Sequence, residues 1–157
     1  MNISARIATE TDLAIINRMY AAAEGEQVAL REAWGVADGF PAPVQETLHE
    51  IASREDARLV VGTIDDVVVG YSWAVVEDLL PQAAGERIGV IRMIYVDEPA
   101  RMVGVGEAML ASVMAWFDER GIARFDAIVS PGHRLAKNFF ESAGFKARRI
   151  TMYRRDA

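Results

Sequence analysis

Residues 91–121, IRMIYVDEPARMVGVGEAMLASVMAWFDERG, contain the most informative pattern in the chain. The stretch opens with a β-branched, apolar run over residues 91–96, a pattern typical of a buried strand. Acidic residues and a proline interrupt the run, and a turn containing Gly104 and Gly106 leads into an apolar helix of about four turns. Gly121 follows at the position of a C-terminal cap. The stretch therefore predicts a strand, a glycine-containing turn and a helix in direct succession.

The turn between this strand and this helix suits an anion. The first N–H groups of a helix lack partners within the helix, and the helix dipole favours negative charge beside them. Gly104 and Gly106 would let a phosphate approach the backbone without meeting a Cβ atom. A dinucleotide fingerprint would need a third glycine where this chain has Met109, and the Gly-Lys-Ser/Thr of a P-loop is absent. Residues 101–106 alone are equally consistent with a helix start whose glycines serve packing.

The composition restricts the classes of function. A chain of 157 residues that is 52% hydrophobic can build one domain around a single core. Without cysteine there is no disulfide, thiolate nucleophile or zinc-finger spacing, and His49 and His133 belong to no metal motif, so we expect no metal. The net charge of −6 disfavours nucleic acid as a partner. With no signal peptide and no apolar run of ~20 residues, we expect a cytoplasmic protein outside the membrane.

The rest of the chain predicts a mixture of strands and helices. Strands are expected over residues 2–8, 58–64, 67–76, 87–96, 123–129 and 146–154, and helices over 9–23, 44–53 and 133–143 besides the central one. Residues 24–43 are ambiguous between a short helix over 28–34 and a loop. Asp65-Asp66 predicts a tight hairpin. The connection from strand 91–96 through the central helix to strand 123–129 is a βαβ unit, which requires parallel neighbours.

Two motifs, together with the order of the elements, resemble the GNAT superfamily of N-acetyltransferases. Residues 101–106 read R-x-x-G-x-G after a strand, which is similar to the family's acyl-CoA pyrophosphate loop. Residues 133–145, HRLAKNFFESAGF, are similar to its second motif, N-x-x-A-x-x-hydrophobic-Y-E-x-x-G-F. The positions that match in register are Ala136, Phe139, Glu141, Gly144 and Phe145.

The resemblance covers essentially the whole chain, since Gly70-Tyr71 also matches a Gly-Phe/Tyr pair in the family's third strand. It implies one domain, residues 1–157, with a mixed α+β fold. The expected central sheet has six to seven strands, antiparallel in its N-terminal half, with a parallel pair that splays apart, and helices flank it. In the family the pantetheine arm of the cofactor lies in that gap like an extra strand.

The resemblance further implies an acetyl-CoA site built largely from backbone groups. Ile94 and Val96 would hydrogen-bond the acetyl and pantetheine groups and polarise the thioester carbonyl. Tyr95 lies between them in the same site, although strand alternation turns its side chain toward the core. Arg101 either adds a charge-assisted contact to phosphate or is a solvated turn residue. The pyrophosphate itself would be held by the amides of Met102, Val103, Gly104, Val105 and Gly106.

Three positions depart from the family's pattern. The tyrosine that often protonates the leaving thiolate corresponds to Phe140, expected beside the CoA sulfur; the motif's asparagine is His133, and a glutamate base is matched by Val90. Bringing amine and thioester together is worth up to ~7–11 kcal/mol, whereas one general acid or base contributes ~10²–10⁴-fold. Transfer without the tyrosine should therefore be slower but not abolished. His133 or Ser130 is the candidate replacement, although the sequence favours His133 as a helix-start residue that contacts the cofactor or solvent.

The acceptor side is less determined. Arg92 is expected on the same strand face as Val90 and Ile94, where it would suit a carboxylate or phosphate on the substrate or else pair with an acidic neighbour. Trp34, Phe40 and Trp73 either wall an acceptor pocket or belong to the core. Glu77, Asp78 and Glu86 either accept an amine proton through water or lie in a solvated loop.

These expectations combine into an N-acetyltransferase that moves an acetyl group from acetyl-CoA to a primary amine of a small molecule or peptide. The amine attacks the thioester directly, since the chain has no cysteine for a covalent cysteine intermediate. The alternative is a weak or inactive acyl-CoA-binding sensor with the same fold, which the absent tyrosine favours. Pairing of the C-terminal strand, residues 150–153, would give a homodimer, although the flanking arginines would equally protect that edge.

Overall fold

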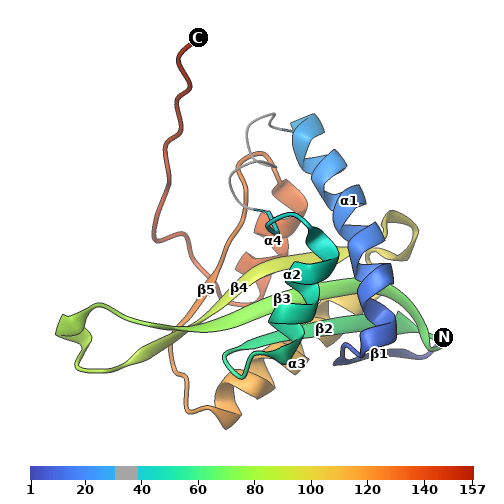
Figure 1. Cartoon of the computed structure of the whole chain (residues 1–157), viewed down its shortest axis with the longest axis horizontal. Coiled ribbons are helices and arrows are strands. Elements are labelled where there is room, and N and C mark those ends of the chain that lie inside the picture. The colour runs from blue at the N-terminus through green and yellow to red at the C-terminus, as the bar shows by residue number, and fades with distance from the viewer. Residues whose placement is uncertain (31–38) are drawn as a thin grey trace.

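The computed structural model describes residues 1–30 and 39–157, in which one sheet separates two layers of helices (Figure 1). The sheet has the order β1-β2-β3-β4-β5. Its strands are β1 (Ile3–Ile7), β2 (Ala57–Ile64), β3 (Val67–Asp78), β4 (Arg87–Val96) and β5 (Phe125–Ala127). The helices are α1 (Leu13–Leu30), α2 (Val44–Ser53), α3 (Val105–Glu119) and α4 (Arg134–Ser142). Short 3₁₀ turns are η1 (Glu10–Asp12), η3 (Pro81–Ala83) and η4 (Glu98–Ala100).

Two hydrophobic clusters fill the space on the two faces of the sheet. On one face, α1 and α2 bury Ile16 and Leu48 against β2 and β3. On the other face, α3 buries Met109 and Trp116, and Phe140 of α4 joins the same cluster. The mixed α+β fold with helices on both faces is the one that the sequence predicts.

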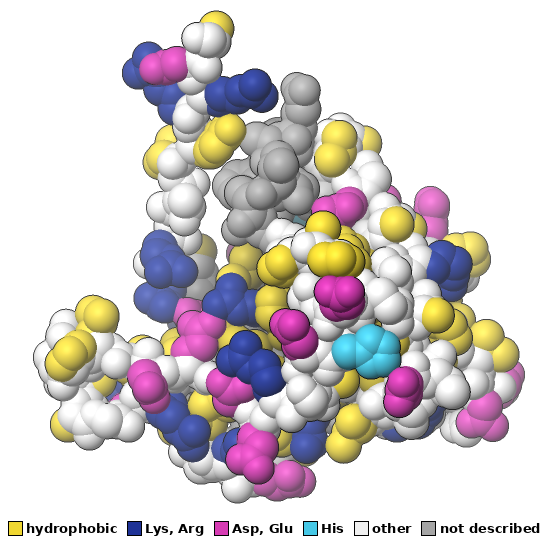
Figure 2. Space-filling model, in the orientation of Figure 1, with side chains coloured by type: hydrophobic (Ala, Val, Ile, Leu, Met, Phe, Trp, Pro, Cys, Tyr) yellow, Lys and Arg dark blue, Asp and Glu magenta, His cyan; other side chains and the backbone are white. Residues whose placement is uncertain are grey.

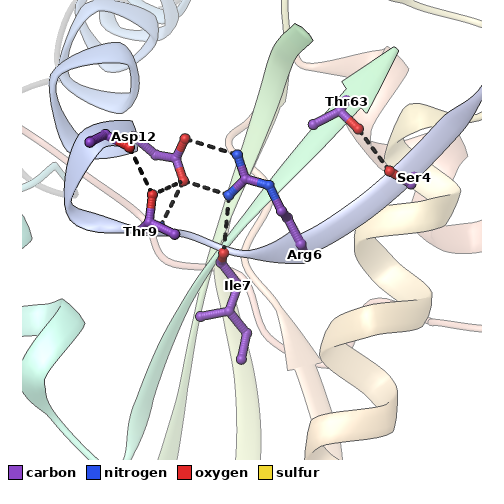
Figure 3. A network of polar contacts seen from close by, with 7 residues as sticks. Ser4, Arg6, Ile7, Thr9, Asp12 and Thr63 are labelled. Carbon is purple, nitrogen blue, oxygen red and sulfur yellow. Dashed lines mark hydrogen bonds and ion pairs between the residues drawn. The ribbon is translucent and has the colours of Figure 1, made fainter. Parts of the chain in front are cut away.

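An ion pair between the exposed Arg6 and the buried Asp12 fixes where α1 begins (Figure 3). Asp12 accepts hydrogen bonds from both terminal nitrogens of Arg6, at 2.6 and 3.1 Å, and from the backbone N–H of Thr9 at 2.7 Å. The hydrogen bonds from Arg6 outweigh the effect of burial and lower the pKa of Asp12 to about 2. This network ties β1 to the start of the helix that carries part of the site.

The antiparallel half of the sheet is built from two hairpins. Short connections join β2 to β3 and β3 to β4, and both pairs are antiparallel. β1 also pairs antiparallel with β2, although α1 and α2 lie between them in the chain. Asp65 and Asp66 form the expected tight turn, with φ values of 47° and 66° at the two residues. Positive φ at both central positions matches the right-handed twist of the flanking strands.

A β-bulge in β4 changes the direction of its side chains. Trp73 of β3 lies opposite Met93, and Ala74 lies opposite Ile91, so Arg92 is the extra residue. Val90 packs in the cluster under α1 and α2, whereas Ile94 packs in the cluster under α3. The prediction that Arg92 shares a face with both is therefore wrong, because the bulge resets the alternation. Nothing in the alternation of residues reveals a bulge.

The parallel pair separates early, as the family resemblance implies. β4 and β5 pair only from Gly89 with Phe125 to Ile91 with Ala127, and the amide of Ile128 reaches the carbonyl of Ile91 at 3.0 Å. β5 is thus shorter than the predicted strand 123–129. Residues 92–96 continue β4 with no strand on that side among the described residues.

The predicted strand over residues 146–154 is wrong, and the described sheet has five strands instead of six to seven. Residues 146–157 have no regular structure and extend away from the body (Figures 1 and 2). Ile150 and Met152 are 78% and 87% exposed. A strand is stable only when its backbone and one face find partners, and apolar alternation alone does not supply them.

Candidate active site

A cavity of about 260 Å3 opens where β4 leaves β5. It is lined by residues of α1, by Tyr71 and Trp73 of β3, by residues 92–95 of β4, and by residues from 128 to 140 at the end of β5 and on α4. Strands and helices from both halves of the chain therefore meet at one site.

The cavity brings together most of the residues that the sequence proposes for chemistry and acceptor binding. Those that line it are Trp73, Arg92, Ile94, Tyr95, Ser130, His133 and Phe140. Val96 and residues 101–106 lie just beyond it in the chain, at the end of β4 and in the turn before α3. Trp34 lies outside the described residues, and Phe40 is a buried core residue.

The turn before α3 has the open backbone that an anion needs at Gly104 but not at Gly106. Gly104 has a φ of 106°, and a Cβ atom there would meet only the Cδ1 of Ile3 at 3.7 Å. A Cβ atom at Gly106 would lie 3.1 Å from the ring of Phe139, so this glycine lets α4 pack against α3. Gly106 therefore serves packing, as the second interpretation predicts, and the backbone at Gly104 stays open to an approaching group.

Arg101 is not a solvated turn residue, because its side chain is held against α1. Its Nε donates to the carbonyl oxygen of Val96 at 2.7 Å, and its Nη2 contacts Glu26 at 2.8 and 2.9 Å. The guanidinium also lies over the ring of Tyr95, 5.4 Å from the centroid. Burial and the charge of Glu26 raise the pKa of Tyr95, which keeps its phenol protonated.

His133 caps α4, as the helix-start interpretation predicts. The backbone N–H of Ala136 donates to Nδ1 of His133 at 3.2 Å. Nδ1 can accept this hydrogen bond only when it carries no proton, because a proton on Nδ1 would place two N–H groups against each other. The ring proton of His133 is then on Nε2. This geometry leaves Nε2–H as the hydrogen-bond donor of the side chain.

Phe140 lies in the last turn of α4, where it is 3% exposed and lines the cavity. Its ring packs edge-on against Phe139 and Phe145, with centroids 5.1 and 5.4 Å apart. The amide of Phe145 donates to the carbonyl of Phe140 at 3.0 Å, and Gly144 has a φ of 92°, so Gly144 and Phe145 form a C-terminal cap on α4.

The positive charge expected on the acceptor side is neutralised within the protein. Arg92 forms an ion pair with Glu77, and its guanidinium lies 5.7 Å from the ring centroid of Trp73. The alternative in which Arg92 pairs with an acidic neighbour is the one the structure has. Glu86 pairs with Arg124 at 2.7 Å and does not line the cavity.

Sequence reasoning missed the contribution of α1. Tyr20, Glu24 and Gln27 line the cavity from one face of this helix. Tyr20 donates to Glu24 at 2.6 Å and accepts from the amide of Phe40 at 2.9 Å. Burial and Glu24 raise the pKa of Tyr20, so it stays a donor. The signal was the spacing of three, four and seven residues, which places polar side chains on one face of a helix.

Other kinds of site find no support in the described part of the chain. No group of three or more His, Cys, Asp or Glu side chains is placed to hold a metal ion in residues 1–30 and 39–157. Within the same ranges, none of the helices is long and apolar enough to span a membrane.

Comparison with known proteins agrees with this architecture. Residues 19–145 match the model of the acetyltransferase (GNAT) family. No curated protein matches the sequence.

Solved structures share the fold over nearly the whole chain. A transcriptional regulator from Bacillus halodurans C-125 is 21% identical with a TM-score of 0.78, over 99% of this chain and 100% of that one. Aminoglycoside N-acetyltransferase AAC(6')-Iy in complex with CoA is 18% identical with a TM-score of 0.70, over 99% and 96%. A ribosomal-protein-alanine N-acetyltransferase from Brucella melitensis biovar Abortus 2308 is 15% identical with a TM-score of 0.69, over 99% and 100%.

Proposed function

Because the chain belongs to the acetyltransferase (GNAT) family, we propose that it transfers an acetyl group from acetyl-CoA to a primary amine of a small molecule or peptide. The observation that carries this proposal is the separation of β4 from β5 after Ile91, beside a cavity that is lined by residues of β4 and by His133, Ala136 and Phe140 of the second motif. A thioester in this gap would lie along the backbone of residues 92–96. The relative AAC(6')-Iy binds CoA, which supports acetyl-CoA as the donor.

In this proposal the donor is held mainly by backbone groups. Main-chain groups of Ile94, Tyr95 and Val96 bind the acetyl and pantetheine portion, and the amides of residues 102–106 bind the pyrophosphate at the start of α3. Open space over Gly104 supports this assignment, because a phosphate needs close approach to the backbone. Arg101 contributes by orienting the turn, since its donors already contact Val96 and Glu26.

The chemistry is direct attack of the amine on the thioester carbon, with a tetrahedral oxyanion stabilised by main-chain N–H groups of β4. The C–S bond then breaks and the thiolate takes a proton. Phe140 has no proton to give, so we propose that His133, through Nε2–H, or Ser130 donates a hydrogen bond to the departing sulfur. Most of the rate then comes from positioning, for which ~7–11 kcal/mol is available.

A second candidate is an acyl-CoA-binding sensor without transfer. It is favoured by Phe140 and Val90, which are 3% and 5% exposed and apolar where active relatives often carry an acid and a base. Release of CoA from acetyl-CoA over a panel of primary amines distinguishes the two functions. The chain has no cysteine, so a thiol reagent reads only the released CoA. Amine-dependent release supports transfer, and binding of acetyl-CoA without release supports the sensor.

We also propose that the chain acts as a single cytoplasmic domain and assembles as a homodimer. β5 is an edge strand, and the tail of residues 146–157 exposes Ile150 and Met152. An unpaired edge and an extended apolar segment on each copy can satisfy each other across a two-fold axis.

A further inference from the structure

Glu24 is the charged residue in the cavity lining that has no opposite charge beside it among residues 1–30 and 39–157. The lining contains two other charged side chains, and both are paired: Glu26 with Arg101, and Arg92 with Glu77. Glu24 is bonded to the neutral phenol of Tyr20. The described lining therefore carries one negative charge that the protein does not neutralise.

The carboxylate of Glu24 is held in place. Tyr20, which is 4% exposed, donates to Oε1 at 2.6 Å and is itself fixed by the amide of Phe40. Gly39 also lines the cavity, and a Cβ atom there would lie 3.2 Å from the same Oε1. The second oxygen, Oε2, has no hydrogen-bond partner within the described residues, so it is available to a ligand.

The surroundings favour a cation as that ligand. Tyr20 and Tyr71 line the same cavity, and aromatic rings attract cations. A positive group that leaves water for this cavity would be compensated by Glu24, whereas a negative group would meet an uncompensated carboxylate.

We propose that Glu24 binds a second positive charge on the acceptor, and that the acceptor class is therefore diamines rather than amines with a carboxylate or phosphate. The nitrogen that attacks the thioester must be the free amine, and a carboxylate beside it would favour its ammonium form instead. A separate ammonium satisfies Glu24 and leaves the reacting nitrogen unprotonated. This inference rests on the proposed acetyl transfer and makes Glu24 a specificity-determining residue.

The test compares three acceptors of equal length: 1,5-diaminopentane, 5-amino-1-pentanol and 5-aminopentanoate. The ratio of kcat/KM for the diamine to that for the amino alcohol is measured with acetyl-CoA for the wild type, for Glu24→Gln and for Glu50→Gln. Glutamine at position 24 keeps an oxygen for the Tyr20 hydrogen bond, and Glu50 is an exposed residue of α2. We expect the wild type to prefer the diamine by ~10- to 100-fold, as for one charge-assisted hydrogen bond.

In Glu24→Gln this ratio should fall to near one, and in Glu50→Gln it should equal that of the wild type. A ratio unchanged in Glu24→Gln, or a wild type that prefers 5-aminopentanoate, overturns the proposal. If no amine releases CoA, the proposal of acetyl transfer is refuted. The role of Glu24 in binding a cation is then tested by calorimetric titration of 1,5-diaminopentane into the CoA-saturated protein. Binding that Glu24→Gln weakens at least tenfold supports the assignment, and absent or equal binding overturns it.

Discussion

Nη2 of Arg101 lies 2.8 and 2.9 Å from the two carboxylate oxygens of Glu26, which joins the turn before α3 to the last turns of α1. The side chains of this pair are 21% and 35% exposed. The same guanidinium donates to the carbonyl of Val96 at the end of β4. One arginine thus connects three segments around the mouth of the gap between β4 and β5.

If Arg101 positions the turn through Glu26, Glu26→Gln should destabilise the protein by ~1 kcal/mol, and Arg101→Ala should cost more because it also removes the hydrogen bond to Val96. The double variant should lose little more than Arg101→Ala alone, because the contact with Glu26 is already absent there. Denaturant unfolding of the four proteins measures this coupling. Additive losses, together with a loss of acetyl-CoA affinity confined to Arg101→Ala, would instead assign the guanidinium to phosphate.

Phe140→Tyr should raise the rate of acetyl transfer with little change in acetyl-CoA affinity, because the added hydroxyl can protonate the thiolate. The gain should not exceed the ~10²–10⁴-fold of general acid catalysis. A hydroxyl without a partner in this buried aromatic cluster would cost ~1–3 kcal/mol of stability, so rate and Tm are measured together.

Phe145→Tyr is the matched control, since Phe145 packs against Phe140 but does not line the cavity. It should leave the rate unchanged. A Phe140→Tyr protein with lower Tm and no gain in rate would make position 140 a core position.

Because of the Arg6–Asp12 pair, the free energy of unfolding should fall at low pH. The pKa of Asp12 is about 2, against an ordinary value of 3.8, so the ionised carboxylate stabilises the fold above pH 3.8 and its contribution falls as pH approaches 2. The contribution is ~2 kcal/mol at neutral pH. Asp12→Asn should lose this contribution. The difference in the free energy of unfolding between the wild type and the variant, measured with urea, should shrink between pH 4 and pH 2. The exposed Asp118→Asn should follow the wild type, and a difference independent of pH would refute the account.

Removal of residues 146–157 should convert a dimer into a monomer in sedimentation velocity at micromolar concentration. Removal of residues 154–157 alone, which leaves Ile150 and Met152, should preserve the dimer. A full-length protein that sediments only as a monomer contradicts the proposed assembly.

Local patterns predict most of this fold because they act over a few residues. Asp65-Asp66 adopt the positive φ values of a tight hairpin, and the sequence from Phe140 to Phe145 contains its own cap. The end of the chain is different. Residues 146–154 have strand-like alternation, but a strand requires a partner that lies elsewhere, and no such partner is specified by the segment itself.

The part of the candidate site that can be predicted from the sequence is the part that belongs to the two motifs. The motif over residues 133–145 supplies part of the cavity lining, and the motif over residues 101–106 predicts the turn that lies just beyond it. The pairing of Arg101 escapes prediction because its counter-ion, Glu26, comes from a distant part of the chain. For Arg92, a pair with an acidic neighbour is one of the two predicted alternatives, but the sequence does not single out Glu77 as the partner. The bulge at Arg92 and the face of α1 that carries Glu24 arise only when the sheet and helix pack together.

Calorimetric titration with acetyl-CoA of the wild type, Gly104→Asp, Gly104→Ala and Gly121→Asp tests the central claim most directly. Gly104 and Gly121 both have positive φ, 106° and 69°, so substitution strains the backbone at either site, but only Gly104 faces the proposed pyrophosphate. We predict that the wild type and Gly121→Asp bind, that Gly104→Ala binds more weakly, and that Gly104→Asp does not bind because its carboxylate meets the phosphates. Folded Gly104→Asp protein that binds acetyl-CoA as tightly as the wild type would contradict the account.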